Sequence, residues 1–247
     1  MSEAAIPELS VIVPVRDEAE NIAPLIAEIE AALGGSGPFE IVYVDDGSRD
    51  ETPARLRAIR AANPRLVVVR HKESCGQSQA VATGVKFARG AIIATIDGDG
   101  QKDPADIPRL VERLRTEPAD RRDLLLVAGR RTKRKDTLTK RLSSRIANAV
   151  RGRMLGDNTP DTGCGLKVLT RAAFLDMPRF DHMHRFLPAL MIRAGGRVES
   201  VPVNHRPRAR GQSKYGMWDR LWVGIVDLFG VMWLQSRGVR PVVERDS

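Results

Sequence analysis

The sequence is poor in cysteine and has no recognisable leader. Only two of its 247 residues are cysteines, Cys75 and Cys164, and they form no CxxC pair. Neither a disulfide framework nor a zinc site is indicated, and a reducing cytosol fits this composition. The first ten residues, MSEAAIPELS, lack the basic and apolar regions of a signal peptide, so we expect none.

A long uninterrupted apolar run is also missing. The most apolar segment, residues 221–234, is interrupted by Asp227 and is shorter than the roughly 20 residues that span a bilayer. We therefore expect no transmembrane helix. Acidic residues are outnumbered, because 40 Lys and Arg face 31 Asp and Glu and leave a formal net charge of +9. This balance favours an anionic partner, which would be nucleic acid, an anionic membrane or a phosphorylated substrate.

What is present is an alternation of apolar and amphipathic segments. Continuous apolar segments of strand length alternate with segments that have helical periodicity or helix start signals, such as Thr52-Pro53. This alternation predicts an α/β fold with a doubly wound, mostly parallel sheet. Strands are expected at 9–15, 40–44, 65–71, 91–96 and 123–129, and helices at about 22–33, 53–62, 76–90 and 103–115. Beyond residue 130 the pattern changes, with a helical segment near 184–194 and a strand at 197–203.

Three of the predicted strands end in polar clusters. These are PVRDE at 14–18, VDDGS at 44–48 and DGDGQ at 97–101. Parallel sheets bind ligands at the carboxyl ends of their strands, so one shared site is expected there. The alternatives are local: an Asx turn for DDGS and an N-terminal helix cap for RDE.

Asp97 and Asp99 are separated by one glycine. Two carboxylates this close raise each other's pKa unless a cation intervenes. A divalent metal with hard oxygen ligands is the simplest remedy, and Gln101 offers a further oxygen. Gly98 would let the backbone turn. The alternative is a solvated acidic turn that caps the helix at residue 104.

Together these motifs resemble glycosyltransferase family 2. The segments VIVPVRDEAENI, EIVYVDDGSRDET, IDGDGQKDPADIPRL and TGCGLKVLTRAAF occur in the family's order and spacing. RPRARGQSKYG further resembles the R-x-x-G-x-S-K signature of the polyprenyl-phosphate sugar transferases, the dolichol-phosphate mannose synthase group. The resemblance covers about residues 9–216. It implies a GT-A fold, a Rossmann-like sandwich, over residues 1–215, with a nucleotide-sugar half (about 1–130) and an acceptor half (about 131–215), followed by a C-terminal helix and tail (216–247).

The resemblance also assigns roles on the donor side. It places Pro14, Arg16 and Glu18 around the nucleobase and ribose of a UDP- or GDP-linked sugar, and Asp46 on the nucleoside. Asp97, Asp99 and Gln101 correspond to the residues that bind Mg²⁺ or Mn²⁺ and the diphosphate.

On the acceptor side, the resemblance implies contacts to phosphate. Acceptor-phosphate contacts are expected from Arg130, Arg141, Ser144 and Ser213. Arg208 and Lys214 match the signature residues that contact phosphates, and both are assigned to the donor. Asp161 lies where the family often has an acid near the acceptor. Asp99, Asp161 and Arg208 are the residues expected to act in catalysis.

The implied reaction is an inverting, metal-dependent transfer of a sugar to polyprenyl phosphate. A lipid phosphate is already charged, so the reaction needs cations that bring two anions together rather than a strong base. A saccharide or lipid hydroxyl is the alternative acceptor, and it would need a base, for which Asp161 is the candidate. A non-catalytic nucleotide- or nucleic-acid-binding protein is a third hypothesis, against which the intact Asp97, Asp99 and Gln101 set argues.

Two segments point to a surface partner. Residues 129–155 carry ten Lys or Arg against one acid, and Leu138, Leu142, Ile146 and Ala149 share one helical face. A basic amphipathic helix on an anionic leaflet is favoured over a solvated helix or RNA binding, since no RNA motif accompanies the charge. Residues 218–237 hold all three tryptophans and predict an apolar helix at a membrane interface, in the core or in an oligomer contact. We expect peripheral attachment to the cytoplasmic face of the cell membrane and no nucleic-acid partner.

Overall fold

The computed structural model describes residues 6–132, 151–207 and 217–239, with side chains from 224 onward in the last range. Several predicted residues lie outside the described ranges, and their roles stay predictions. These are Arg141, Ser144, Arg208, Ser213 and Lys214. Most of the basic segment, residues 133–150, lies outside them as well.

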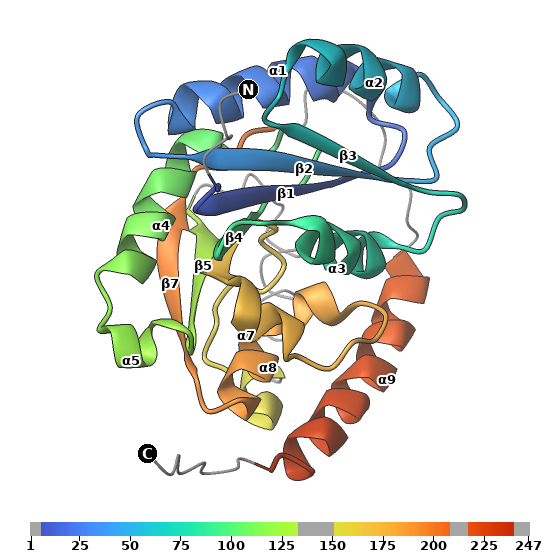
Figure 1. Ribbon diagram of the computed structural model, residues 1–247. Coiled ribbons are helices and arrows are strands. Elements are labelled where there is room, and N and C mark those ends of the chain that lie inside the picture. The colour runs from blue at the N-terminus through green and yellow to red at the C-terminus, as the bar shows by residue number, and fades with distance from the viewer. Residues whose placement is uncertain (1–5, 133–150, 208–216, 240–247) are drawn as a thin grey trace, which may run out of the picture.

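The described residues form one mixed sheet of seven strands with helices on both faces (Figure 1). The strand order is β3-β2-β1-β4-β6-β5-β7, and only β6 runs antiparallel to its neighbours. This confirms the α/β, doubly wound, mostly parallel prediction. The strands are β1 (Leu9–Val15), β2 (Phe39–Asp46), β3 (Leu66–His71), β4 (Ile92–Thr95), β5 (Leu125–Arg131), β6 (Lys167–Thr170) and β7 (Arg197–Val203).

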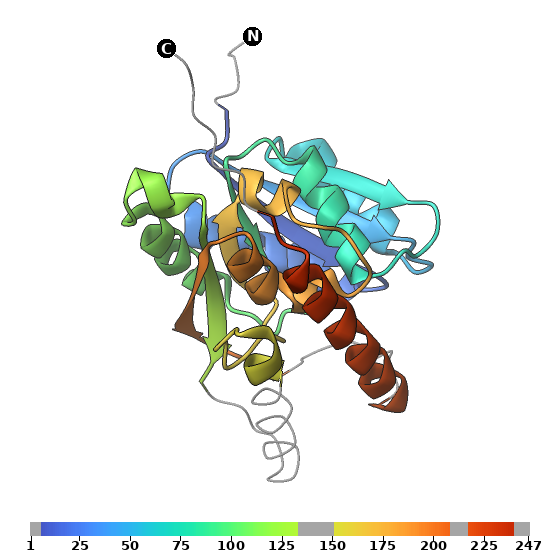
Figure 2. The ribbon, with the colours of Figure 1, turned by 90° about the horizontal axis from the view of Figure 1, so that it is seen from below.

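Two helical layers cover the sheet (Figures 1 and 2). The first contains α1 (Ala19–Leu33), α2 (Thr52–Ala62) and α4 (Ile107–Arg115), which pack in one apolar cluster with the sheet. The second contains α3 (Gln77–Phe87), α7 (Arg171–Leu175) and α8 (Leu187–Arg193), which pack in another. The remaining elements are α5 (Ala119–Arg122), the 3-10 turns η1 (Pro104–Asp106) and η2 (Met183–Arg185), a helical segment at 151–155, and α9 (Met217–Ser236).

Strand β1 shows why both faces must be covered. Val11 and Val13 belong to the cluster with α1 and α4, whereas Ile12 between them belongs to the cluster with α3. All three side chains are fully buried. Alternation of side chains across a strand sends apolar residues to both faces, so a continuous apolar segment becomes a central strand.

Strand β6 was not anticipated, and it shapes the functional edge of the sheet. It pairs antiparallel with β4, so that Lys167 lies opposite Thr95 at the end of β4. The segment that leads into β6, residues 161–166, is thereby brought beside the acidic loop that follows β4. This reversed strand connects the donor half of the sequence with the acceptor half.

Helix α9 lies at the border of the molecule and packs through one face (Figure 2). Val231 is buried against Leu155, Phe186 and Ala189. The Gln235 side-chain amide donates to the Leu155 carbonyl at 2.9 Å. Among the described residues, no helix is long and apolar enough to cross a membrane.

Candidate active site

The polar clusters at the ends of β1, β2 and β4 meet at one edge of the sheet, as predicted. The Asp17 backbone N–H donates to Ser48 Oγ at 2.9 Å, and the Glu18 N–H donates to Thr52 Oγ1 at 3.0 Å. These hydrogen bonds join the first cluster to the second. Arg16 reaches further across the edge and donates to Ser74 Oγ at 2.9 Å.

Asp46 organises the loop after β3. Its carboxylate accepts hydrogen bonds from Ser74 Oγ and from the backbone N–H groups of Cys75 and Gly76, at 2.8 to 2.9 Å, and it contacts His71 Nδ1 at 2.8 Å. Burial raises the pKa of Asp46, but these hydrogen bonds outweigh it and hold the pKa below its ordinary value. Asp46 thus fixes residues 71–76 over the end of β2, and its contact with the nucleoside stays a prediction.

The acidic loop after β4 contains its own cation. Asp97 Oδ1 accepts from the Gln77 side-chain amide at 2.9 Å, and Asp97 Oδ2 lies 3.5 Å from the Lys102 ammonium, which is buried. Asp99 Oδ1 accepts from the Gln101 N–H at 3.1 Å. The charge of the paired aspartates is therefore partly balanced within the chain, before any metal binds.

Gly98 does not make the backbone turn that the sequence predicted. The left-handed backbone angle falls on Gly100, whose φ is +71°. A side chain at Gly98 would place its Cβ 2.3 Å from Val15 Cγ1. Gly98 is thus needed for close packing against β1, and Gly100 makes the turn. The helix after the loop is capped by Asp103, whose Oδ1 accepts from the Ala105 N–H at 3.1 Å.

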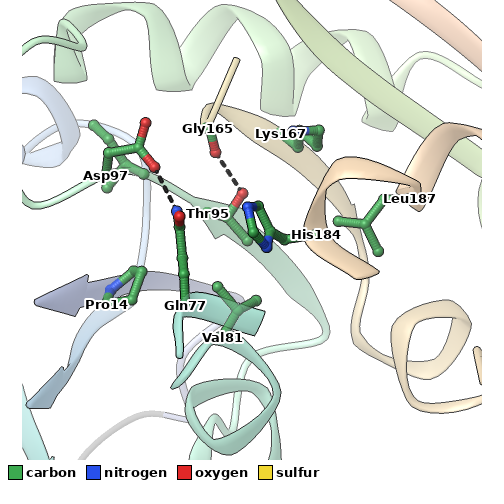
Figure 3. Close-up of a pocket in the computed structure, with 10 residues that line it drawn as sticks. Pro14, Gln77, Val81, Thr95, Asp97, Gly165, Lys167, His184 and Leu187 are labelled. Atoms are coloured by element: carbon green, nitrogen blue, oxygen red, sulfur yellow. Dashed lines mark hydrogen bonds between the residues drawn. The ribbon is translucent and has the colours of Figure 1, made fainter. Parts of the chain in front are cut away.

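Gly165 brings the acceptor half onto this loop. A Cβ at Gly165 would lie 2.2 Å from both carboxylate oxygens of Asp97. The Gly165 carbonyl accepts from Thr95 Oγ1 at 2.7 Å, which Figure 3 shows beside Asp97. Only a residue without a side chain allows Asp97 to take this position.

Asp97, Asp99 and Gln101 fit the expected metal. All three offer oxygen donors within one five-residue loop, which is the ligand chemistry that Mg²⁺ and Mn²⁺ prefer. The Gln101 backbone is engaged at both ends, since its N–H donates to Asp99 and its carbonyl accepts from the Arg206 N–H at 2.9 Å. Among the described residues its side-chain amide has no hydrogen-bond partner, so its oxygen is available to an ion.

A segment just before the R-x-x-G-x-S-K signature is tied to the same loop. The Arg206 guanidinium lies 2.8 Å from Asp103 and 2.7 Å from Glu28. The neighbouring Asn204 N–H donates to Asp106 at 2.7 Å. Residues 204–206, which directly precede the signature, are therefore anchored beside the acidic loop. Sequence reasoning missed Arg206 as an anchor, because its partners are distant in sequence.

Asp161 is buried and forms an ion pair with the partly buried Arg131. Its two oxygens accept from the Arg131 guanidinium at 2.6 and 2.7 Å, and Oδ2 also accepts from the Arg131 N–H at 3.1 Å. Burial alone lowers the pKa of Arg131, but its bonds to Asp161 raise it above the ordinary value. Arg130, the predicted phosphate ligand, is exposed beside it on β5. Sequence reasoning chose Arg130 and gave no role to Arg131.

A small cavity lies under Asp97 (Figure 3). Its volume is about 20 Å³, which is room for one water or one ligand oxygen. It is bounded by the ends of β1 and β4, the start of α3, strand β6 and the η2–α8 region. The lining residues are Pro14, Gln77, Val81, Thr95, Ile96, Asp97, Gly165, Lys167, His184 and Leu187.

The family follows from a comparison of the whole chain with known proteins. The model of glycosyl transferase family 2 matches residues 10–177, which include the three strand-end clusters and the Gly165 segment. The chain belongs to glycosyltransferase family 2. This transferase is 37% identical over 240 residues to the dodecaprenyl-phosphate galacturonate synthase of Rhizobium johnstonii, covering 95% of this chain and 69% of the relative. It is 33% identical to the undecaprenyl-phosphate 4-deoxy-4-formamido-L-arabinose transferase of Edwardsiella ictaluri, covering 85% of this chain and 63% of the relative. The chain thus spans about two thirds of the length of these curated relatives.

Solved structures of similar fold include two nucleotide complexes. One is glucosyl-3-phosphoglycerate synthase from Mycobacterium tuberculosis with Mg²⁺ and UDP, with a TM-score of 0.67, 21% identity and coverage of 96% of this chain and 81% of that one. The other is a mannosyltransferase from Pyrobaculum calidifontis with GDP-Man and Mn²⁺, with a TM-score of 0.65, 22% identity and coverage of 95% and 66%. At this identity the likeness shows the fold, which is the GT-A-like fold expected from the sequence.

Proposed function

We propose that this glycosyltransferase moves a sugar from a UDP- or GDP-linked donor to a polyprenyl phosphate, with inversion at the sugar carbon. The names of the two curated relatives describe transfer to such lipid phosphates. The observation that carries the proposal is the Asp161–Arg131 ion pair. A hydroxyl acceptor would need a free base near the sugar, whereas Asp161 is held by Arg131 and a phosphate acceptor needs no base.

Donor binding is assigned to the strand ends. Pro14, Arg16 and Glu18 would surround the nucleoside at the end of β1. Asp97, Asp99 and Gln101 would hold Mg²⁺ or Mn²⁺, as ions of this kind are present in the two similar structures. When bound, such an ion neutralises the diphosphate leaving group.

Acceptor-phosphate binding is assigned to Arg130, Arg141, Ser144 and Ser213, as the sequence predicted. Arg130 lies one residue before the end of β5, next to the ion pair. Residues 204–206 precede the signature, in which Ser213 is assigned to the acceptor and Arg208 and Lys214 to the donor phosphates. The acceptor groups would hold the lipid phosphate near the sugar carbon, and the arginines and lysine on both sides would offset the repulsion between the two anions. Positioning and charge neutralisation then supply the rate enhancement.

Membrane contact is assigned to α9 and the basic segment. The face of α9 turned away from the body exposes Ile225, Val226, Phe229 and Trp233, the last two to 60% each. Exposed apolar and aromatic side chains, in a chain that also has a strongly basic segment in its sequence, match the chemistry of an anionic leaflet, where the lipid acceptor resides. We place the protein on the cytoplasmic face of the membrane.

The test is a transfer assay with a matched acceptor pair. Purified protein with Mg²⁺ or Mn²⁺ would receive a panel of UDP- and GDP-sugars and either undecaprenyl phosphate or undecaprenol in detergent. Mass spectrometry would follow nucleotide release and sugar-lipid together. We expect a sugar-phospholipid from the phosphate only. Product from undecaprenol, or from neither lipid, would contradict the proposal.

A further inference from the structure

The cavity under Asp97 is lined by a buried lysine, Lys167, which has no role in the proposed transfer reaction. Lys167 is only 2% exposed. Its ammonium group donates to the backbone carbonyls of Thr162, at 3.2 Å, and of Cys164. Among the described residues no carboxylate lies within ion-pairing distance of it. A buried charge without a counter-ion is costly, so such a position favours an anionic ligand.

His184 adds a second donor on the cavity wall (Figure 3). Its backbone N–H donates to Ser78 Oγ at 3.2 Å, so the Ser78 hydroxyl proton is free to point to His184 Nδ1, 2.6 Å away. The ring proton then resides on Nε2, which has no partner among the described residues. Burial lowers the pKa of His184 to about 3, so the ring is neutral at physiological pH.

The cavity is therefore lined by two nitrogen donors besides Gln77, one of them cationic, and by one carboxylate. The lining residues Lys167 and His184 both carry N–H donors, and the one carboxylate among the lining residues, Asp97, already accepts from Gln77 and lies near Lys102. The available volume of about 20 Å³ admits the end of a substituent rather than a sugar ring. Two of the lining residues, Pro14 and Asp97, are also assigned to the donor.

We propose that this cavity receives a carboxylate oxygen of the transferred sugar, and that Lys167 and His184 make the enzyme selective for uronic acid donors over the matching neutral hexoses. The inference rests on the proposed function for the place of the donor. Lys167 would supply the counter-charge and His184 Nε2 a hydrogen bond to the same group. Burial lowers the pKa of Lys167, and a bound carboxylate would raise it again.

The experiment measures donor binding without any acceptor. Calorimetry with Mn²⁺ would first compare UDP with GDP, and then UDP-galacturonate with UDP-galactose, or GDP-mannuronate with GDP-mannose, according to the nucleotide that binds. We expect the uronate to bind at least about tenfold more tightly than its neutral partner, because the hexose leaves Lys167 without a counter-ion.

Two variants assign the preference to its residues. Lys167→Met keeps length and removes charge, and His184→Asn keeps a polar group near Ser78 while removing Nε2. Both should cut the preference for the uronate while binding of the bare nucleotide stays unchanged. Lys86→Met, at an exposed position of α3, is the control and should keep the preference. A preference that survives in Lys167→Met would overturn the assignment.

The outcomes separate this inference from the proposed function. If the nucleotide binds but the wild-type protein shows no preference for the uronate, the inference is wrong and the transfer assay still decides the function. That comparison uses only wild-type protein, so the inference can be rejected even if a variant fails to fold. If neither UDP nor GDP binds, both proposals fail.

Discussion

At the residue scale, the site depends on Asp97 and on the glycines that make room for it. Gly98 lets the loop approach Val15, and Gly165 lets the β6 segment approach the Asp97 carboxylate. Gln77 and Lys102 then hold that carboxylate in place. An aspartate binds a metal ion well only if its oxygens are already oriented toward the ion's position. The residues that fix this orientation therefore contribute to metal affinity along with the aspartates.

Gly165→Ala tests this arrangement. The new Cβ would displace the Asp97 carboxylate, so we expect metal affinity and turnover to fall by at least about tenfold, with a stability loss of about 1–3 kcal/mol from overpacking. Manganese titration and thermal unfolding would measure both effects. Gly35→Ala is the control, because a Cβ at Gly35 would meet open space, and it should change neither metal affinity nor stability. Gly156 is unsuitable as a control because its φ of +66° would strain an alanine. Unchanged turnover in Gly165→Ala would contradict the prediction.

Asp99→Asn tests the metal itself. Removing one ligand charge should lower turnover by about 100-fold or more and shift the manganese requirement upward. Steady-state kinetics over a range of Mn²⁺ concentrations would show this. Asp120→Asn, on exposed α5, is the matched control and should behave like the wild type. If Asp99→Asn keeps its turnover and metal dependence, the metal assignment is wrong.

The Arg131–Asp161 pair gives a prediction that separates two roles of Asp161. Asp161 is the buried member of this ion pair, and its loss alone leaves Arg131 unpaired, so Asp161→Asn should cost about 3–5 kcal/mol of stability. The double variant Arg131→Met with Asp161→Asn should recover part of that loss. Urea unfolding of the wild type and of these two variants would measure this recovery.

Turnover of the same folded variant decides between the acceptors. With a phosphate acceptor, Asp161→Asn should keep turnover within about tenfold of the wild type. Loss of about 100-fold or more would instead indicate a general base and a hydroxyl acceptor.

At the element scale, the reversed strand β6 and the segment before the signature decide which distant residues meet. β6 runs against β4, so its entry segment reaches the loop after β4 rather than the opposite edge of the sheet. Residues 204–206 follow β7 and bind the same loop through Arg206 and Asn204. Two parts of the acceptor half thus converge on the donor loop from different strands.

Arg206→Met tests the second of these connections. Loss of the ion pairs with Glu28 and Asp103 should loosen the start of the signature, so we expect the KM for the lipid phosphate to rise severalfold while nucleotide binding changes little. Stability should change by about 1 kcal/mol or less, since these pairs are partly exposed. Arg55→Met, which breaks the exposed pair with Glu51, is the control. An unchanged KM would show that the signature needs no such anchor.

At the scale of the whole molecule, net charge and exposed apolar surface are the two features that favour binding to a membrane surface. The net charge of +9 attracts anionic surfaces over a distance, while the apolar face of α9 supplies short-range contact. The two act differently with salt, because screening weakens the first and leaves the second in place.

Replacement of Phe229 and Trp233 by serine tests the apolar part. Each side chain is 60% exposed, and burial of both in a leaflet contributes about 2–4 kcal/mol, so the double variant should bind anionic vesicles at least about tenfold more weakly. Sedimentation with vesicles at low and high salt would separate the charge contribution from the apolar one. Phe87→Ser removes a similarly exposed aromatic from α3 and should bind as the wild type does. Equal binding of all three proteins would exclude α9 as the contact.

The sequence by itself determined the sheet, the edge that carries the site and the family. Continuous apolar segments could only be strands covered on both faces, and polar clusters at their ends could only meet at one edge. The five strands expected in the first half are all present, as are β7 and the helix at 187–193. Asp97, Asp99 and Gln101 could be predicted as metal ligands because they lie close together in one short motif.

Only the tertiary structure decided which residues complete that motif. β6 is short and antiparallel, and nothing in its four residues signals its direction. The contacts of Gln77 and Gly165 with Asp97, and of Arg131 with Asp161, join residues that are far apart in the chain. Local patterns could not predict them, nor the cavity lined by Lys167 and His184. Local periodicity reports which residues are buried, whereas the contacts of a buried charge depend on elements that lie far away in the chain.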